Sequence, residues 1–267
     1  MTLTQYKTHK SAQQKLDKLF ADGEDVLFIH YSCESFYDNP NRSSHRITSI
    51  AVHSLKHGQT KSFSIHQEAE LMNIPTDQII GDYEKVEKRM LNKFNKFILN
   101  NKHHFWIHWN MRDSNYGFEA ITHRSQVLKV CKLKEIPDDR KYDLSKILYE
   151  LLGPDYIENP KLETILVKNN MKPKDFLNGK AEAEAFENGE YIKLHQSTLT
   201  KVVAMKHLAK YATAGKLKCN NNYFKKKGFT LSTASAGIKN HPLYALICII
   251  IALVTLISDA TQWWPFR

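Results

Sequence analysis

Acidic residues are missing from one long stretch of this chain. Between Lys201 and His241 there are nine lysines and no Asp or Glu. The whole chain carries 38 Lys and Arg against 28 Asp and Glu, a formal net charge of +10, whereas the first 200 residues have a net charge of only +1. A generally basic body, of the kind that binds nucleic acid over its whole surface, is therefore excluded, and the basic excess belongs to one segment.

Cysteine is scarce, and several familiar motifs are missing. The four cysteines are scattered and form no CxxC pair, which argues against a disulfide framework and a zinc site and fits a reducing cytoplasm. There is no Walker motif, no GxGxxG and no nucleophile elbow, so common nucleotide-binding and acyl-transfer chemistries have little support. The polar stretch from Met1 to Lys18 does not resemble a signal peptide.

The one long apolar run lies near the C-terminus. Residues 243–257 are apolar apart from one tyrosine and one threonine, and Trp263 and Trp264 follow them. A membrane-spanning helix needs about 20 mostly apolar residues, and tryptophan rings favour the headgroup level. We therefore predict a transmembrane helix over residues 242–264, with Trp263 and Trp264 at one membrane interface. The alternative is a hydrophobic C-terminal helix docked on its own domain.

Lysines precede this run and predict its orientation. Lys225, Lys226, Lys227 and Lys239 lie on the N-terminal side of the predicted span. Lysines beside a span mark its cytoplasmic side, and each attracts anionic headgroups by roughly 1 kcal/mol. We expect a single-pass protein of the inner (cytoplasmic) membrane, with its N-terminal body in the cytoplasm, membrane lipid as a partner, and association of copies through the membrane helix. The alternative is a phosphate-binding patch at residues 225–227.

The body, residues 1–213, has the element order of an α/β domain with a mixed sheet flanked by helices. A β-rich apolar run from Val26 predicts a buried strand, and two alternating segments around Lys56-His57-Gly58 predict a hairpin. A helical pattern over residues 82–100 precedes a strand over residues 104–109. Residues 214–241 are predicted to be a lysine-rich linker. Further helices are predicted over residues 11–20, 116–130, 144–152, 162–169 and 197–212.

Three segments resemble, in order, the motifs of the DEDD-type 3′–5′ exonucleases of the ribonuclease H-like superfamily. In Val26-LFIHYSCES, Glu34 falls at the Glu of the family's Asp-x-Glu motif. Phe105-WIHWNMRDSNYGF resembles the second motif, with Asn110 three residues before Asp113. Leu194-HQSTLTKV offers His195 at the histidine of the third motif. The resemblance covers roughly residues 24–210 and implies a ribonuclease H-like fold.

The resemblance implies metal-dependent chemistry, and two departures from the family weaken it. Such enzymes hold two Mg²⁺ or Mn²⁺ ions with four carboxylates; here Glu34 and Asp113 are the candidate ligands and His195 the candidate general base. The family's first and last Asp fall on Ser32 and Thr200, and a hydroxyl is a poor substitute for an anionic ligand. Neighbouring acids that can substitute are Asp38, Glu182 and Glu184.

Each candidate residue also has a simpler explanation. Glu34 can be a solvated loop acid, Asp113 a helix N-cap, and His195 a histidine bonded to a backbone carbonyl. Trp109 and Asn110 are the candidate nucleic-acid contacts, because an exposed ring can stack on a base, although an aromatic-rich buried strand explains the same cluster.

Two functional hypotheses follow. In the first, the domain binds a nucleic acid or nucleoprotein partner and the membrane helix is the effector, by analogy of architecture with prokaryotic anti-phage effectors. In the second, the chain is a membrane-tethered, metal-dependent 3′–5′ nuclease. A third reading rests on residues 25–38, which resemble the first strand of a TIR domain and imply NAD processing. The hairpin that follows disfavours this reading, because TIR folds alternate strands and helices from the start.

Overall fold

The structure is a computed structural model that describes residues 3–21, 25–35, 44–112, 114–130 and 135–228, together with Ile249, Ile250 and Leu253. At its centre is a five-stranded mixed sheet with the order β3-β2-β1-β4-β5. The pairs β1–β2 and β2–β3 are antiparallel, whereas β4 is parallel to β1 and β5 is parallel to β4. The strands are β1 (Val26–Cys33), β2 (Ile47–Ser54), β3 (Thr60–Ser64), β4 (Phe105–His108) and β5 (Lys141–Asp143).

The predicted α/β class and mixed sheet are confirmed, and the arrangement is compatible with a ribonuclease H-like fold. The predicted hairpin is present as β2 and β3. Its turn closes through Gly58, whose amide donates to the carbonyl of Ser54 at 3.0 Å. Gly58 has φ +65°, a backbone conformation that glycine adopts without steric cost.

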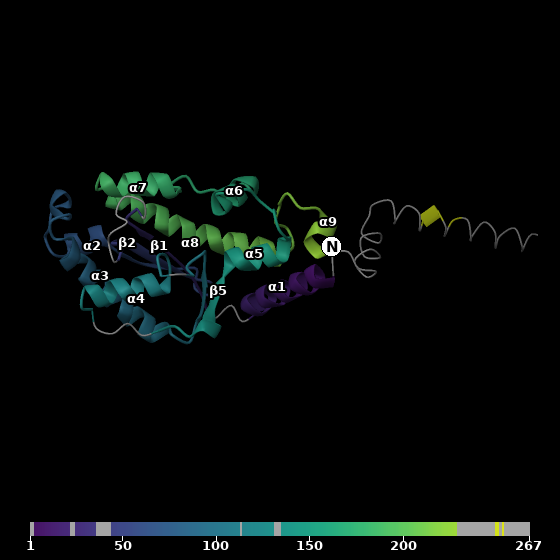
Figure 1. Cartoon of the computed structure of the whole chain (residues 1–267), viewed down its shortest axis with the longest axis horizontal. Helices are drawn as coiled ribbons and strands as arrows, with labels where there is room; N and C mark the ends of the chain where they lie inside the picture. The colour runs from purple at the N-terminus through teal and green to yellow at the C-terminus, as the bar shows by residue number, and fades with distance from the viewer. Residues whose placement is uncertain are drawn as a thin grey trace, which may run out of the picture.

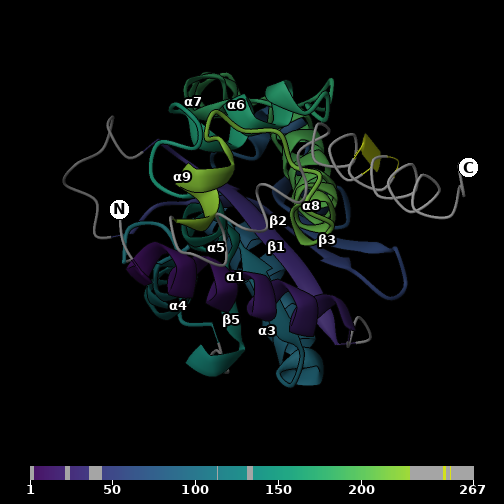
Figure 2. The same ribbon diagram turned by 90° about the vertical axis from the view of Figure 1, so that its right-hand side faces the viewer.

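Helices cover both faces of the sheet (Figures 1 and 2). The first face carries α2 (Ile65–Glu70), α3 (Tyr83–Asn101) and α4 (Phe118–Val127). The second carries α1 (Leu3–Ala21), α5 (Leu144–Leu152), α6 (Lys161–Lys168) and most of α8 (Tyr191–Thr213). Side chains of a strand alternate between faces, so Leu27 and Ile29 of β1 join the first core and Val26 and Phe28 the second.

Two helices are longer than the sequence indicates. The N-terminal helix begins at Leu3 and not at Ser11. The long helix α8 begins at Tyr191, six residues before the predicted start at Ser197. Ser197 is not a helix cap: it is fully buried, and its Oγ accepts a hydrogen bond from the amide of Leu177 at 3.1 Å. The short elements α2, β5 and α7 (Gly179–Glu187) were not predicted at all.

The described part of the predicted linker is folded onto the body. Leu217 and Asn221 are buried, and the side-chain Nδ2 of Asn221 donates to the carbonyls of Leu152 and Pro154 at 2.9 and 2.6 Å. The short helix α9 (Tyr223–Lys227) packs against α1 and α5. The chain therefore stays attached to the body up to Gly228.

The membrane segment predicted over residues 242–264 lies outside the described residues, apart from Ile249, Ile250 and Leu253. Within the part of the chain that is described, no helix is both long enough and apolar enough to cross a bilayer.

Replacing Gly153 by alanine should release α9. Gly153 has φ +83°, and a Cβ there would lie 2.7 Å from the carbonyl oxygen of Lys225. Gly58→Ala is the matched control, because Gly58 also has positive φ but nothing lies within 4 Å of its Cβ position. Both variants should lose about 1–3 kcal/mol of stability from the backbone conformation, and Gly153→Ala the more, because φ +83° with ψ 170° is a region essentially restricted to glycine. Only Gly153→Ala should also speed hydrogen exchange over residues 222–228; equal exchange in the two variants would contradict the close packing.

Candidate functional site

A pocket of about 460 Å³ lies at the carboxyl end of β1, and we call it the β1 pocket. Three segments line it: residues 31–35 of the chain, Tyr116 ahead of α4, and the start of α7 from Gly179 to Ala183. Ligands of open α/β sheets bind outside the carboxyl ends of the strands. This pocket also contains Ser32 and Glu34 of the first predicted motif, so it is the candidate functional site.

Glu34 is held in a buried ion pair. Its side chain is 1% exposed, which rules out the solvated loop acid. Oε2 accepts from the Nε of Arg46 at 2.7 Å, and Oε1 accepts from the amide of Arg46 at 2.9 Å. The guanidinium of Arg46 lies over the rings of Tyr83 and Phe186, 5.0 Å from each centroid. The charge of Glu34 is thus already neutralised by a protein cation.

Three hydroxyl groups occupy the interior beside Glu34, and we call them the hydroxyl triad: Ser32, Ser49 and Thr198. The Oγ atoms of Ser32 and Ser49 are 3.0 Å apart, and Thr198 Oγ1 is 2.8 Å from Ser49 and 3.1 Å from Ser32. All three side chains are buried. Each hydroxyl therefore finds its partners within the protein, and the triad joins β1, β2 and α8.

The helix residue that faces Ser32 is Thr198 and not Thr200, which the sequence places at the last acidic position of the family. Thr200 Oγ1 instead donates to the carbonyl of Ser197 in its own helix. Both residues carry hydroxyls, so neither choice supplies a carboxylate. The departure from the family pattern seen in the sequence therefore persists in three dimensions.

A buried lysine follows one turn later on α8. The ammonium of Lys201 is 2.6 Å from Oε1 of Glu182, and its side chain is 5% exposed. It also lies over the ring of Phe176, 4.9 Å from the centroid. Glu182, which the sequence offers as a substitute metal ligand, is thus paired with a lysine. Glu184, the other described substitute, is exposed and lies 3.8 Å from Lys180.

Tyr116 forms an aromatic wall of the β1 pocket that the sequence did not single out. Its ring stacks on Tyr31 with centroids 4.5 Å apart and planes 18° apart. Its hydroxyl donates to the carbonyl of Tyr31 at 3.0 Å and lies 3.2 Å from Nδ1 of His30. Burial, and secondarily the charge of Lys201, hold the pKa of His30 well below its usual value. The signal in the sequence was the position of Tyr116 near the end of the second motif segment.

Trp109 and Asn110 of the second predicted motif do not line the β1 pocket. Asp113 lies outside the described residues. Asn110 is exposed, and its amide donates to Oδ1 of Asp143 at 3.2 Å while its side-chain oxygen accepts from Arg112 at 2.9 Å. Trp109 is 6% exposed and packs in the second core, so the prediction of an exposed stacking ring at Trp109 is wrong.

His195 is buried and is not among the residues that line the β1 pocket. Its ring is 4.9 Å from the ring of His66. Burial, with a smaller contribution from His66, lowers the pKa of His195 to about 4, so the imidazole is neutral at pH 7. Its Nε2 is buried without a hydrogen-bond partner. Across the described ranges, no three His, Cys, Asp or Glu side chains are grouped to hold a metal ion.

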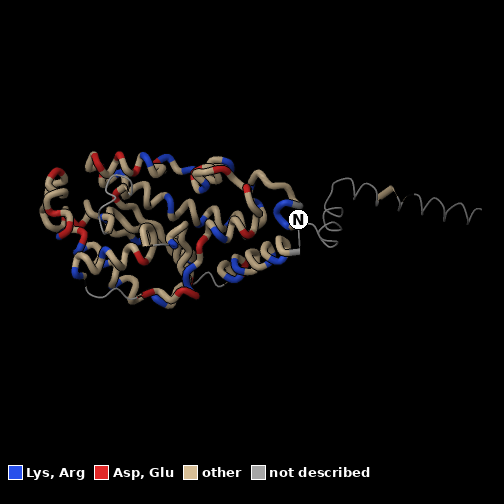
Figure 3. Tube along the Cα trace, in the orientation of Figure 1, with Lys and Arg blue, Asp and Glu red and all other residues tan. Residues whose placement is uncertain are grey.

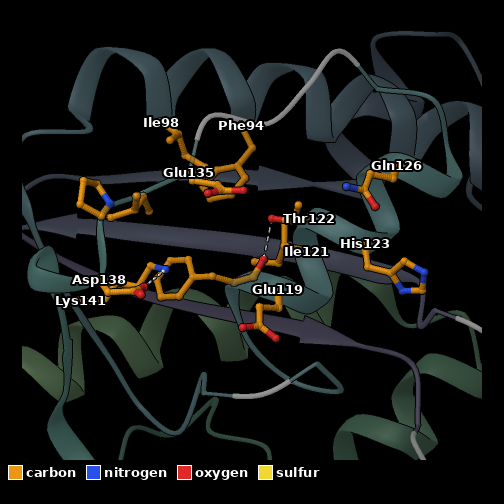
Figure 4. Close-up of a pocket in the computed structure, with 13 residues that line it drawn as sticks. Phe94, Ile98, Glu119, Ile121, Thr122, His123, Gln126, Glu135, Asp138 and Lys141 are labelled. Carbon is orange, nitrogen blue, oxygen red and sulfur yellow. Dashed lines mark hydrogen bonds and ion pairs between the residues drawn. The ribbon is translucent and has the colours of Figure 1, made fainter.

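A larger hollow of about 610 Å³ lies between α3, α4 and residues 135–141. Figure 4 shows the acidic side chains Glu119, Glu135 and Asp138 around it, with Lys141 bonded to Asp138 at 2.8 Å. Its floor is apolar and includes Phe94 and Ile98. None of the predicted site residues lines it, and we favour the smaller β1 pocket because buried polar groups converge there.

No known family model matches the chain, and no curated protein is similar to it. The function is therefore inferred from the topology of the sheet and the geometry of the β1 pocket.

Stability should fall as the pH drops from 7 to 5. Burial lowers the pKa of His53, His108 and His195 to about 4 in each case, whereas an unfolded histidine titrates near pH 6.5. The unfolded chain then binds more protons, so stability present above pH 6.5 is lost as the pH falls towards 4. Each histidine contributes a slope of at most about 1.4 kcal/mol per pH unit.

Urea unfolding at a series of pH values measures this slope. His195→Gln should flatten it, whereas the matched variant His57→Gln, in an exposed turn, should leave it unchanged. A slope that is the same in all three proteins would contradict the assignment of a buried, neutral His195.

Proposed function

We propose that this chain is a membrane-anchored binding protein whose ribonuclease H-like body recognises a nucleic acid or a nucleoprotein partner without cleaving it. In this proposal the body lies at the cytoplasmic face of the membrane, residues 242–264 span the bilayer, and the membrane helix acts as the effector when copies associate. A role in anti-phage defence is consistent with this architecture by analogy alone.

The observation that carries the proposal is the hydroxyl triad of Ser32, Ser49 and Thr198. Two-metal catalysis needs carboxylates that converge on a shared pair of ions. The space between β1 and α8 instead holds three neutral hydroxyls bonded to one another. Glu34 is bonded to Arg46 and Glu182 to Lys201, so each carboxylate beside the triad has a protein cation as its partner. This arrangement supports binding over phosphodiester hydrolysis.

The nuclease hypothesis remains the second candidate because Glu34 lies at the carboxyl end of β1 and lines a pocket. On that hypothesis, Glu34 and Asp113 hold Mg²⁺ or Mn²⁺ and His195 takes a proton from water. The pKa of His195, which burial lowers to about 4, weighs against this role, and His195 is not among the residues that line the β1 pocket. TIR-like NAD processing is the weaker alternative, because β1 is followed by the β2–β3 hairpin and not by a helix.

Nuclease activity is tested on labelled single-stranded and duplex oligonucleotides with Mg²⁺ or Mn²⁺. We expect no chelator-sensitive degradation by the full chain. Robust degradation that Asp113→Asn and Glu34→Gln abolish, and that Glu184→Gln on the exposed face of α7 leaves intact, would replace the binding proposal with the nuclease hypothesis.

Binding itself is tested at Lys180, which lines the β1 pocket and has a side chain 87% exposed. Lys180→Glu replaces an attractive charge by a repulsive one at the pocket mouth. It should weaken binding of a single-stranded oligonucleotide by roughly tenfold at low salt, measured by fluorescence anisotropy. Lys88→Glu, an exposed lysine of α3, is the matched control; equal effects of both variants would place the binding surface elsewhere.

A further inference from the structure

Lysines from the two ends of the described body meet on one surface. Lys7 and Lys10 are exposed on α1, and Lys225 is exposed on α9. These helices are in contact: the side-chain amide of Gln5 donates to the carbonyl of Lys226 at 3.1 Å. Figure 3 shows basic residues of both helices at the end of the body near the N-terminus. We call this surface the basic end.

The lysine charges of α9 also interact electrostatically with His9 of α1. His9 of α1 lies 2.6 Å from the carbonyl of Leu151. Burial is the main cause that lowers the pKa of His9, and the positive charges of Lys227 and Lys226 lower it further. The ammonium groups are therefore close to the first turns of α1.

The acidic side chains of α1 and α5 have partners. Glu150 of α5 is paired with Lys15 of α1 at 2.9 Å. The one acid in α1, Asp17, accepts from Gln13 at 2.8 Å, and α9 has no acid. Positive charge therefore predominates on α1 and α9.

The basic end is built into the fold and is not a property of a free linker. Asn221 and the close approach of Gly153 to Lys225 fix α9 on the body. The position of α9 relative to α1 is therefore set before any partner arrives. A surface whose charges are already placed loses less conformational entropy on binding than a flexible lysine tail.

We infer that the basic end is a docking surface for anionic lipid headgroups and that it fixes the orientation of the body on the membrane. The inference rests on the proposed membrane anchor. Thirteen residues separate Gly228 from Pro242 and span at most about 45 Å when extended, so the anchor holds the basic end near the headgroups. Clustered lysines of this kind recognise anionic lipid through summed charge.

This orientation would leave the β1 pocket accessible from the cytoplasm. The helix α7, whose first residues line that pocket, lies toward the opposite end of the body from α9 (Figure 1). The lipid surface and the proposed partner would then contact different ends of the body.

Lysine footprinting of the full chain tests the inference. The protein is mixed with vesicles of phosphatidylcholine alone or with about 30% phosphatidylglycerol, acetylated briefly, and analysed by mass spectrometry. Acetylation of Lys7, Lys10 and Lys225 should fall by at least about threefold in the anionic vesicles and recover near 1 M salt, where screening is nearly complete. Lys180 and Lys85, which are 87% and 67% exposed, should react equally in both vesicles.

A charge-reversed variant, Lys7→Glu with Lys10→Glu, should reduce the protection of Lys225 because the two helices share one surface. Both substitutions lie at exposed helix positions, and circular dichroism verifies that the variant is folded. Equal acetylation of the basic end in both kinds of vesicle, or equal protection of Lys180, would overturn the inference.

Vesicle flotation in the same samples separates this inference from the membrane anchor. If the protein floats with both kinds of vesicle but anionic vesicles do not protect the lysines of the basic end from acetylation, the inferred docking surface is overturned and the membrane anchor is retained. If the protein floats only with anionic vesicles and salt reverses this, the docking surface is supported and the membrane anchor is contradicted. If the protein floats with neither kind of vesicle, both proposals are contradicted. Protection of Lys225 by a single-stranded oligonucleotide but not by vesicles would overturn the inference in favour of nucleic acid.

Discussion

The packing of α8 across β1 and β2 is the constraint on which the site depends. At the centre of this contact the hydroxyls of Ser32, Ser49 and Thr198 bond to one another. A buried hydroxyl that has no hydrogen-bond partner destabilises the folded state by about 1–3 kcal/mol. Because all three hydroxyls must meet to avoid this cost, they fix the rotation and register of α8 on the sheet. Once α8 is placed, Lys201 reaches Glu182 and the start of α7 closes over the end of β1.

The site compensates its charges internally, with a protein cation paired to the buried Glu34 and another to the half-buried Glu182. In a two-metal enzyme, the carboxylates coordinate the metal ions, and the charge of the ions stabilises the attacking and leaving oxygens. Here Arg46 and Lys201 supply positive charge directly to Glu34 and Glu182. The result is a pocket with an aromatic wall, Tyr116, and little uncompensated charge inside, which suits recognition by shape and stacking.

The sequence predicted the parts of the fold that have long or strongly periodic patterns. The mixed sheet, the β2–β3 hairpin and α5 follow from alternation, a glycine turn and an amphipathic stripe. The three-residue strand β5 and the short helix α7 carry too little pattern to be predicted, because their positions are set by contacts with neighbouring elements. The segment after α8 looked like a linker because Leu217 and Asn221 are isolated among lysines, yet these two residues attach it to the body.

The sequence predicted where Glu34 lies in the fold but not which side chain it contacts. Glu34 lies at the end of β1, where the motif placed it, but its bond to Arg46 cannot be read from spacing. Trp109 directly follows β4 and was predicted to be exposed. Its side chain is buried in the second core instead, because helices cover both faces of the sheet.

Whether the β1 pocket binds a catalytic metal ion is tested most directly by Mn²⁺ binding to the full chain, followed by electron paramagnetic resonance. We predict no saturable site, and no difference between the natural chain and Glu34→Gln. Stoichiometric Mn²⁺ binding that Glu34→Gln abolishes would contradict the account.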